Sequence, residues 1–214
     1  MRAGSIISLA AVLAAAGALN GCATLSEEQC LVGDWYNIGV ADGQNGYAFS
    51  RLEDHNEACQ RHGVIPDAST YEQGRQRGLM SYCTPQVGFR EGRQGDTYRG
   101  VCPASVEADF LAGYSDGRLV HAAQQAYQTA YNDLNSYRQQ ASNIEFQIRT
   151  EETNLNAEGL TDEQRRTIRD RIRRLRDDRE RALDQARDAE WRMRGAEQEV
   201  GRLRAQFAAY YGSW

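Results

Sequence analysis

A heptad repeat of apolar residues in the second half of the chain constrains the fold more than any other feature. Up to residue 157 it comprises Val120, Tyr127, Leu134, Ala141, Ile148 and Leu155, with Ala123, Ala130, Tyr137 and Ile144 in the companion positions. After residue 161 it resumes as Ile168, Leu175, Ala182, Ala189, Ala196, Leu203 and Tyr210, with Ile172, Ala186, Met193, Val200 and Phe207 between them. Heptads on both sides of a short break predict an antiparallel helical hairpin.

Folding the chain at residue 160 predicts which residues of the two arms meet. Gly113 would face Phe207, and Ala141 would face Arg179. Each arm of about 50 residues would be roughly 75 Å long, at 1.5 Å per residue. The last aromatic residues should then return to the first half of the chain and cap its core: Phe207, Tyr210, Tyr211 and Trp214.

The charges of the chain argue against a nucleic-acid-binding protein. All 25 basic residues are Arg, 30 residues are acidic, and the formal net charge is −5. Segment 162–187 has ten Arg against seven acids, whereas the facing segment 145–158 has one Arg against four acids. We interpret the Arg run as a self-neutralised, solvated helix face rather than a polyanion site.

Three apolar side chains of the hairpin fall outside its seam: Tyr131, Leu183 and Trp191. We predict that they form a contact for a third helix, either from another copy of the chain or from an envelope protein. The alternative is that they only cover the rim of the seam, because single exposed apolar residues are normal.

The first residues have the pattern of an export signal, with an apolar run from Ile6 to Leu19 that is short for a membrane span. Leu19-Asn20-Gly21-Cys22 resembles a bacterial lipobox, so we expect a cleaved signal over 1–21, an acylated Cys22 and a linker over 22–29. Ala23 is not the Asp that retains lipoproteins in the inner membrane, which favours the periplasmic face of the outer membrane. An ordinary signal with an incidental Cys is the alternative.

Four further cysteines are Cys30, Cys59, Cys83 and Cys102. An even number in an exported segment predicts two disulfides, with three possible connectivities. A metal site made of His55, Cys59 and His62 is the alternative, because their spacing places them within two helical turns.

Helix geometry favours one connectivity of these cysteines. Two antiparallel helices on either side of the Gly63–Pro66 turn would separate Cys59 from Cys83 by roughly 18 Å, whereas a disulfide needs Cα atoms less than about 7 Å apart. An earlier helix that starts at Asp34 would bring Cys59 back toward Cys30. We therefore favour the pairs Cys30–Cys59 and Cys83–Cys102.

A glycine repeat runs through the first half of the chain. An aromatic residue is followed by Gly at +3 and +7 in Tyr36/Gly39/Gly43, Tyr71/Gly74/Gly78 and Phe110/Gly113/Gly117, and Phe89/Gly92 is a shortened copy. On a helix, such glycines clear one face for another backbone, whose approach must compensate for about 1 kcal/mol of helix propensity per Gly. Short β-hairpins with Gly at the turns are the alternative.

Several strings occur in an order that is specific: Cys30-x3-Asp34-Trp35-x2-Ile38-Gly39-x3-Gly43, Tyr71-x2-Gly74-Arg75-x2-Gly78-Leu79-x2-Tyr82-Cys83-Thr84-Pro85, Gly88-Phe89-x2-Gly92 and Phe110-x2-Gly113-Tyr114. Over about residues 30–118 the chain thereby resembles a family of bacterial lipoproteins, domain-of-unknown-function family 2799. The resemblance implies a lipoprotein without an assigned activity, and it carries over no catalytic residue.

These patterns predict an all-α protein with four parts: a lipoprotein signal peptide over 1–21, an anchor linker over 22–29, a small disulfide-pinned, glycine-rich helical unit over 30–102 and a long antiparallel coiled-coil hairpin over 103–214. An enzyme is disfavoured, because only His55, His62 and His121 could act as bases at neutral pH and no nucleophile accompanies them. We interpret His55 as a residue on the surface of its helix.

We therefore expect a non-enzymatic lipoprotein without metal or cofactor. It would act in the envelope as a spacer, adaptor or docking arm through its hairpin. The alternative is a peptidoglycan-binding module that uses exposed aromatic residues of the first half: Trp35, Tyr36 and Tyr98.

Overall fold

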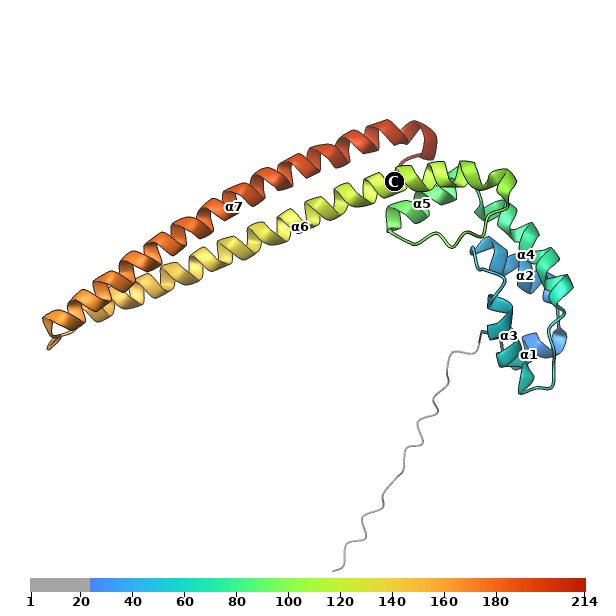
Figure 1. Ribbon diagram of the computed structural model, residues 1–214, viewed down its shortest axis with the longest axis horizontal. Coiled ribbons are helices and arrows are strands. Elements are labelled where there is room, and N and C mark those ends of the chain that lie inside the picture. The colour runs from blue at the N-terminus through green and yellow to red at the C-terminus, as the bar shows by residue number, and fades with distance from the viewer. Residues whose placement is uncertain (1–23) are drawn as a thin grey trace, which may run out of the picture.

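The computed structural model describes residues 24–214, so the predicted signal peptide and Cys22 lie outside the described residues. Within that range the chain forms helices and no strand: α1 Glu27–Val32, α2 Trp35–Gln44, α3 Arg51–Gln60, α4 Ala68–Tyr82, α5 Pro85–Gln94, α6 Ala104–Leu155 and α7 Asp162–Tyr211. The predicted all-α class is confirmed. Helices α6 and α7 form one long hairpin, and α1–α4 extend from its base at an angle to the hairpin (Figure 1).

Helices α2 and α4 lie side by side, and their glycines bring the two backbones into contact. A Cβ atom at Gly39 would overlap with the carbonyl oxygen of Tyr71, and one at Gly74 would overlap with that of Tyr36. The same contact recurs one turn later in both helices, at Gly43 with Arg75 and at Gly78 with Val40. Because the contacts advance together along both helices, the pair is parallel.

Helices α5 and α6 repeat this parallel crossing. The carbonyl oxygen of Phe110 lies against Gly88, and that of Pro85 lies against Gly113. The fourth copy of the motif is therefore full-length, Pro85/Gly88/Gly92, and its first position is Pro85 rather than an aromatic residue. Pro is compatible with this position because it begins α5, where no backbone N–H is needed for the helix.

Two disulfides tie these helices together, and both predicted pairs are confirmed. Cys30–Cys59 joins α1 to α3 with Cα atoms 5.4 Å apart, and Cys83–Cys102 joins the end of α4 to the segment before α6 at 5.6 Å. The helix arrangement that favoured them was wrong, because α4 packs on α2 rather than antiparallel to α3. Helix α3 has no glycine with which to offer a clear backbone face, so it serves as the connection between the two parallel helices.

The folded part of the chain includes most of the segment expected as a linker. Leu25 is buried in the same cluster as Cys30 and Trp35. The hydroxyl of Ser26 accepts a hydrogen bond from the backbone N–H of Gln29, which caps α1. The fold therefore begins within two or three residues of Cys22.

The base of the hairpin is closed by aromatic residues of α5 and of the chain end. The ring of Phe89 packs against Phe207, Tyr211 and Trp214, with centroids 5.8, 4.2 and 5.5 Å away. The predicted return of the last aromatic residues is thus seen for these three, whereas Tyr210 is exposed. Gly113 does not face Phe207, because α5 already covers that side of α6.

None of the helices between residues 24 and 214 is both long enough and apolar enough to cross a bilayer.

The glycine crossings can be tested by adding a single methyl group. We expect Gly43→Ala to lower the free energy of unfolding by about 1–3 kcal/mol, because the new Cβ overlaps with the Arg75 carbonyl oxygen. Gly201→Ala is the matched control: it lies within α7 with no atom near its added Cβ, so it should stabilise by up to about 1 kcal/mol. Urea unfolding of the two variants measures the difference, and equal effects would contradict this account.

Candidate functional site

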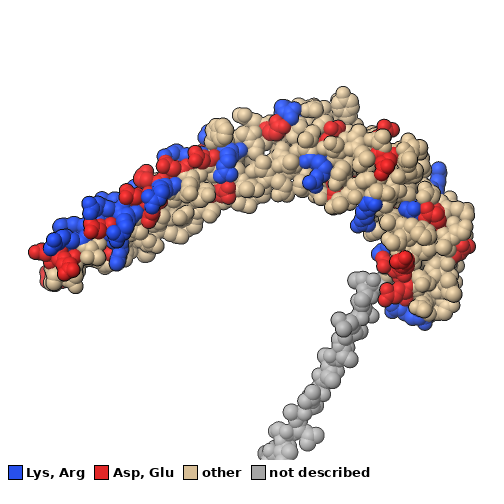
Figure 2. All heavy atoms as spheres, viewed as in Figure 1, with Lys and Arg blue, Asp and Glu red and all other residues tan. Residues whose placement is uncertain are grey.

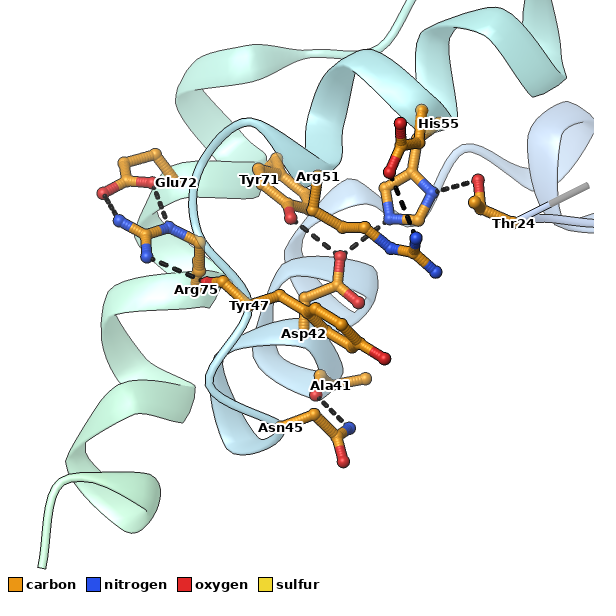
Figure 3. Close-up of polar contacts among 11 residues, drawn as sticks. Thr24, Ala41, Asp42, Asn45, Tyr47, Arg51, His55, Tyr71, Glu72 and Arg75 are labelled. Atoms are coloured by element: carbon orange, nitrogen blue, oxygen red, sulfur yellow. Dashed lines mark hydrogen bonds and ion pairs between the residues drawn. The ribbon is translucent and has the colours of Figure 1, made fainter. Parts of the chain in front are cut away.

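A buried polar network joins α2, α3 and α4 beside the first crossing (Figure 3). Asp42 of α2 accepts two hydrogen bonds on the same carboxylate oxygen, one from His55 Nε2 of α3 and one from the Tyr71 hydroxyl of α4, both 2.7 Å long. The other ring nitrogen of His55, Nδ1, lies 2.7 Å from the hydroxyl oxygen of Thr24. The network therefore extends from the first described residue to α4.

His55 is buried, with 2% of its surface exposed, so the interpretation as a surface residue was wrong. Leu52, His55 and Cys59 follow one another at spacings of three and four residues and share the buried face of α3. This spacing was visible in the sequence and could have indicated burial. What the sequence lacked was the partner, because Asp42 lies on another helix.

The hydroxyl, imidazole and carboxylate of Thr24, His55 and Asp42 stand in the order of a nucleophile, a base and an orienting acid. The surroundings do not suit catalysis, because His55 is enclosed and the Asp42 oxygen that orients it is shared with Tyr71. A cavity of about 290 Å³ beside α3 is lined by Phe49, Leu52, Glu53, Asn56, Ile65 and Pro66, and by none of the network residues. We interpret the network as a structural contact that holds α2, α3 and α4 together.

Beside this network, Arg75 of α4 pairs with Glu72 of the same helix and also contacts the segment between α2 and α3. Arg75 is buried and donates from Nε and from Nη2 to the two oxygens of Glu72, at 2.7 and 2.8 Å. Its Nη1 donates to the backbone carbonyl of Tyr47 at 3.2 Å. Although burial opposes the shift, these hydrogen bonds keep the pKa of Glu72 below its ordinary value.

An acid precedes the second glycine in three of the four glycine motifs: Asp42, Glu91 and Asp116. Each accepts a hydrogen bond from a tyrosine hydroxyl: Tyr71 at 2.7 Å, Tyr82 at 3.4 Å and Tyr211 at 2.7 Å. Burial and the neighbouring carboxylates raise the pKa of all three, to about 12 for Tyr82 and Tyr211. The hydroxyls thus remain protonated donors at neutral pH.

The predicted partner residues of the hairpin lie on its surface but not in one compact patch. Trp191 is 75% exposed, Tyr131 is 44% exposed and Leu183 is partly buried. The ion pair between Asp133 and Arg192, 3.1 Å long, places Tyr131 and Trp191 at a similar level of the rod. Leu183 precedes Trp191 by eight residues, which puts it about 12 Å closer to the tip.

Arg and acidic residues are interleaved along the outer half of the hairpin (Figure 2). Arg171 pairs with Glu151 at 2.8 Å and Arg176 pairs with Glu152 at 2.7 Å, both across the two arms. A shallow groove of about 900 Å³ near the tip is lined by both signs of charge: Glu152, Asp170, Arg166, Arg169, Arg173 and Arg176, with Leu155, Asn156 and Ile172. These pairs agree with a self-neutralised face.

Several residues of the metal and peptidoglycan alternatives take part in other contacts. Cys59 is in a disulfide and His55 is in the polar network, and residues 24–214 contain no cluster of three His, Cys, Asp or Glu side chains fit for a metal ion. Trp35 is buried in the first core cluster, whereas Tyr98 packs on the second. Only Tyr36 of the three aromatic residues is exposed.

The comparisons with known proteins agree with the sequence resemblance. The model of a family described as protein of unknown function (DUF2799) matches residues 34–119. This stretch contains both glycine crossings and ends inside α6. No curated protein and no solved structure matches the chain.

The structural role of the polar network can be tested by removing the imidazole of His55. We expect His55→Leu to lower the free energy of unfolding by about 1–3 kcal/mol, because the Asp42 carboxylate stays buried with one partner fewer. His62→Leu is the matched control, since His62 is partly exposed and its nearest carboxylate oxygen, on Glu27, is 3.7 Å away. Thermal and urea unfolding should separate the variants, and an unchanged stability of His55→Leu would refute the role given to the network.

Proposed function

We propose that the protein, whose residues 34–119 match the model of the DUF2799 family, is a lipid-anchored docking arm of the bacterial envelope. In this proposal the disulfide-pinned unit is the base and the hairpin is the arm. No chemical step is assigned to it. The anchor would be the acylated Cys22, and the arm would extend from the periplasmic face of the outer membrane.

The observation that carries the proposal is the continuity of α6. This helix has 52 residues from Ala104 to Leu155, a length of about 78 Å. Its first turns form the glycine crossing with α5, and the rest forms the seam with α7. Base and arm therefore share one helix, which supports a function that depends on holding a surface at a distance and in a fixed direction.

Helix α7 is also held against the base. The hydroxyl of Tyr211 near the end of α7 donates to Asp116 of α6 at 2.7 Å, beside the ring cluster around Phe89. The two helices of the hairpin are thereby held together at both ends, by this ring cluster at one end and by the turn at the tip. Bending of the arm would break contacts along the seam.

The outer face of the arm supplies the surface for a partner. Trp191 is a large apolar side chain of α7 that is mostly exposed. Aromatic residues are enriched in the centres of interfaces, because they bury a large area with little loss of rotamer freedom. We propose that Trp191, with Tyr131 at a similar level, contacts a helix of an envelope protein or of a second copy.

The anchor is supported by the position of Cys22 and by the disulfides. Cys22 follows the apolar run after only Asn20 and Gly21. Two disulfides suit an oxidising compartment such as the periplasm. Stable anchoring needs more than one acyl chain, which modification at an N-terminal cysteine provides.

The anchor can be tested with Cys22→Ser. We expect this variant to remain as an unacylated precursor in the inner membrane, because the acylated residue is missing. Cell fractionation and mass spectrometry of the mature N-terminus measure the outcome, with Ala23→Ser as the control that keeps the cysteine. Normal outer-membrane fractionation of Cys22→Ser would overturn the anchor.

The docking surface can be tested with Trp191→Glu. We expect weaker self-association in light scattering or fewer envelope crosslinks, with an unchanged helical signal, because the substituted side chain does not contact the seam. Phe146→Glu is the matched control, since Phe146 is an exposed aromatic residue on the other helix. If Trp191→Glu changes neither readout, or if Phe146→Glu changes them equally, Trp191 is not part of an interface.

A further inference from the structure

Three exposed aliphatic side chains occur in the two segments that the first disulfide joins, and we call them the apolar end. They are Leu31, Val32 and Ile65, which are 62%, 71% and 84% exposed. Leu31 and Val32 directly follow Cys30 in α1, and Cys30 is bonded to Cys59. The backbone N–H of Val64 donates to the carbonyl of Cys59 at 3.3 Å, and Ile65 follows Val64 in the turn after α3.

Further contacts place α1 and the turn after α3 against each other. His62 lies 3.7 Å from Glu27 of α1, and Val64 packs on the core cluster that contains Leu25 and Cys30. Figure 1 shows α1 and α3 at the end of the molecule far from the hairpin tip. The apolar end is therefore a property of the base, separate from the docking surface of the arm.

The chain is held in place by contacts from Thr24 onward. Thr24 is held by His55 through a contact of 2.7 Å, Leu25 is buried and Ser26 caps α1. Only two residue steps separate Cys22 from Thr24, and two residues span at most about 7 Å. An acyl group on Cys22 would therefore hold the folded base directly on the bilayer surface, without a flexible linker between them.

We infer that the apolar end rests in the interfacial layer of the same bilayer that holds Cys22. This inference rests on the proposed acylation of Cys22. Aliphatic side chains are favoured at the boundary between headgroups and acyl chains, about 5–10 Å deep. With the acyl chains as the first contact and the apolar end as the second, the base has a fixed orientation, and so has the arm that shares its helices.

The charges of α1 identify the kind of lipid surface that fits. Glu27 and Glu28 form the first turn of α1, one turn before Leu31 and Val32. Both are exposed, so an anionic headgroup layer would be repelled by them. The apolar end therefore suits a surface of zwitterionic lipids, where the contact is apolar rather than electrostatic.

A tryptophan probe at the apolar end tests the inference in the full-length acylated protein. In vesicles of phosphatidylcholine brominated on the acyl chains, Leu31→Trp should add emission that is blue-shifted and quenched by the bromines. Leu119→Trp is the matched control, because Leu119 is an exposed Leu of α6, and its added emission should not be quenched. Ile65→Trp is a second probe if the first variant does not fold.

The outcomes separate this inference from the proposed function. Mass spectrometry of the N-terminus decides whether Cys22 is acylated, and its absence overturns both. If Cys22 is acylated but the probes at Leu31 and Ile65 are not quenched, the anchor stands and the apolar end does not contact lipid. A blue shift without quenching would show that another protein or a second copy covers this end, which also overturns the inference.

Discussion

The contact of helix backbones at the glycine motifs is the constraint on which the rest of the molecule depends. Each of these glycines lowers helix propensity by about 1 kcal/mol relative to Ala, so eight of them would be costly without a compensating contact. Close packing of the two backbones compensates for this cost, and each helix contributes to it. The carbonyl oxygen of Tyr36 contacts Gly74, and that of Tyr71 contacts Gly39. The same exchange between Pro85 and Phe110 in the second crossing shows that one packing device is used twice.

The two crossings differ in what surrounds them, and this difference divides the molecule into base and arm. The first is enclosed by polar groups, with the Asp42 carboxylate held by His55 and Tyr71. In the second, the corresponding faces are covered by rings around Phe89 that come from the end of α7. The rings around Phe89 therefore join the second crossing to the end of α7, and so hold the hairpin against the base.

Patterns that are local in sequence were predictable, and pairings between distant helices were only partly so. The heptads specified the hairpin, and the glycine spacing specified close helix crossings, because both depend on the period of a single helix. The choice of α2 rather than α3 as the partner of α4 was missed, because neighbouring helices were assumed to pack antiparallel. The pairing of α2 with α4 could have been predicted from the glycines, because the spacing of Gly39 and Gly43 matches that of Gly74 and Gly78.

The burial of His55 was missed for a related reason. A histidine near Arg51 and Glu57 has a polar local sequence, and only its partner Asp42 makes burial favourable, since a buried polar group needs a hydrogen bond. Asp42 in turn is buried because the glycine beside it draws α4 close enough for Tyr71 to reach its carboxylate. Three of the four motifs pair such an acid with a tyrosine, so the acid before the second glycine belongs to the crossing itself. The polar network thus follows from the backbone contact, and the position of Thr24, near the proposed anchor, follows from the network.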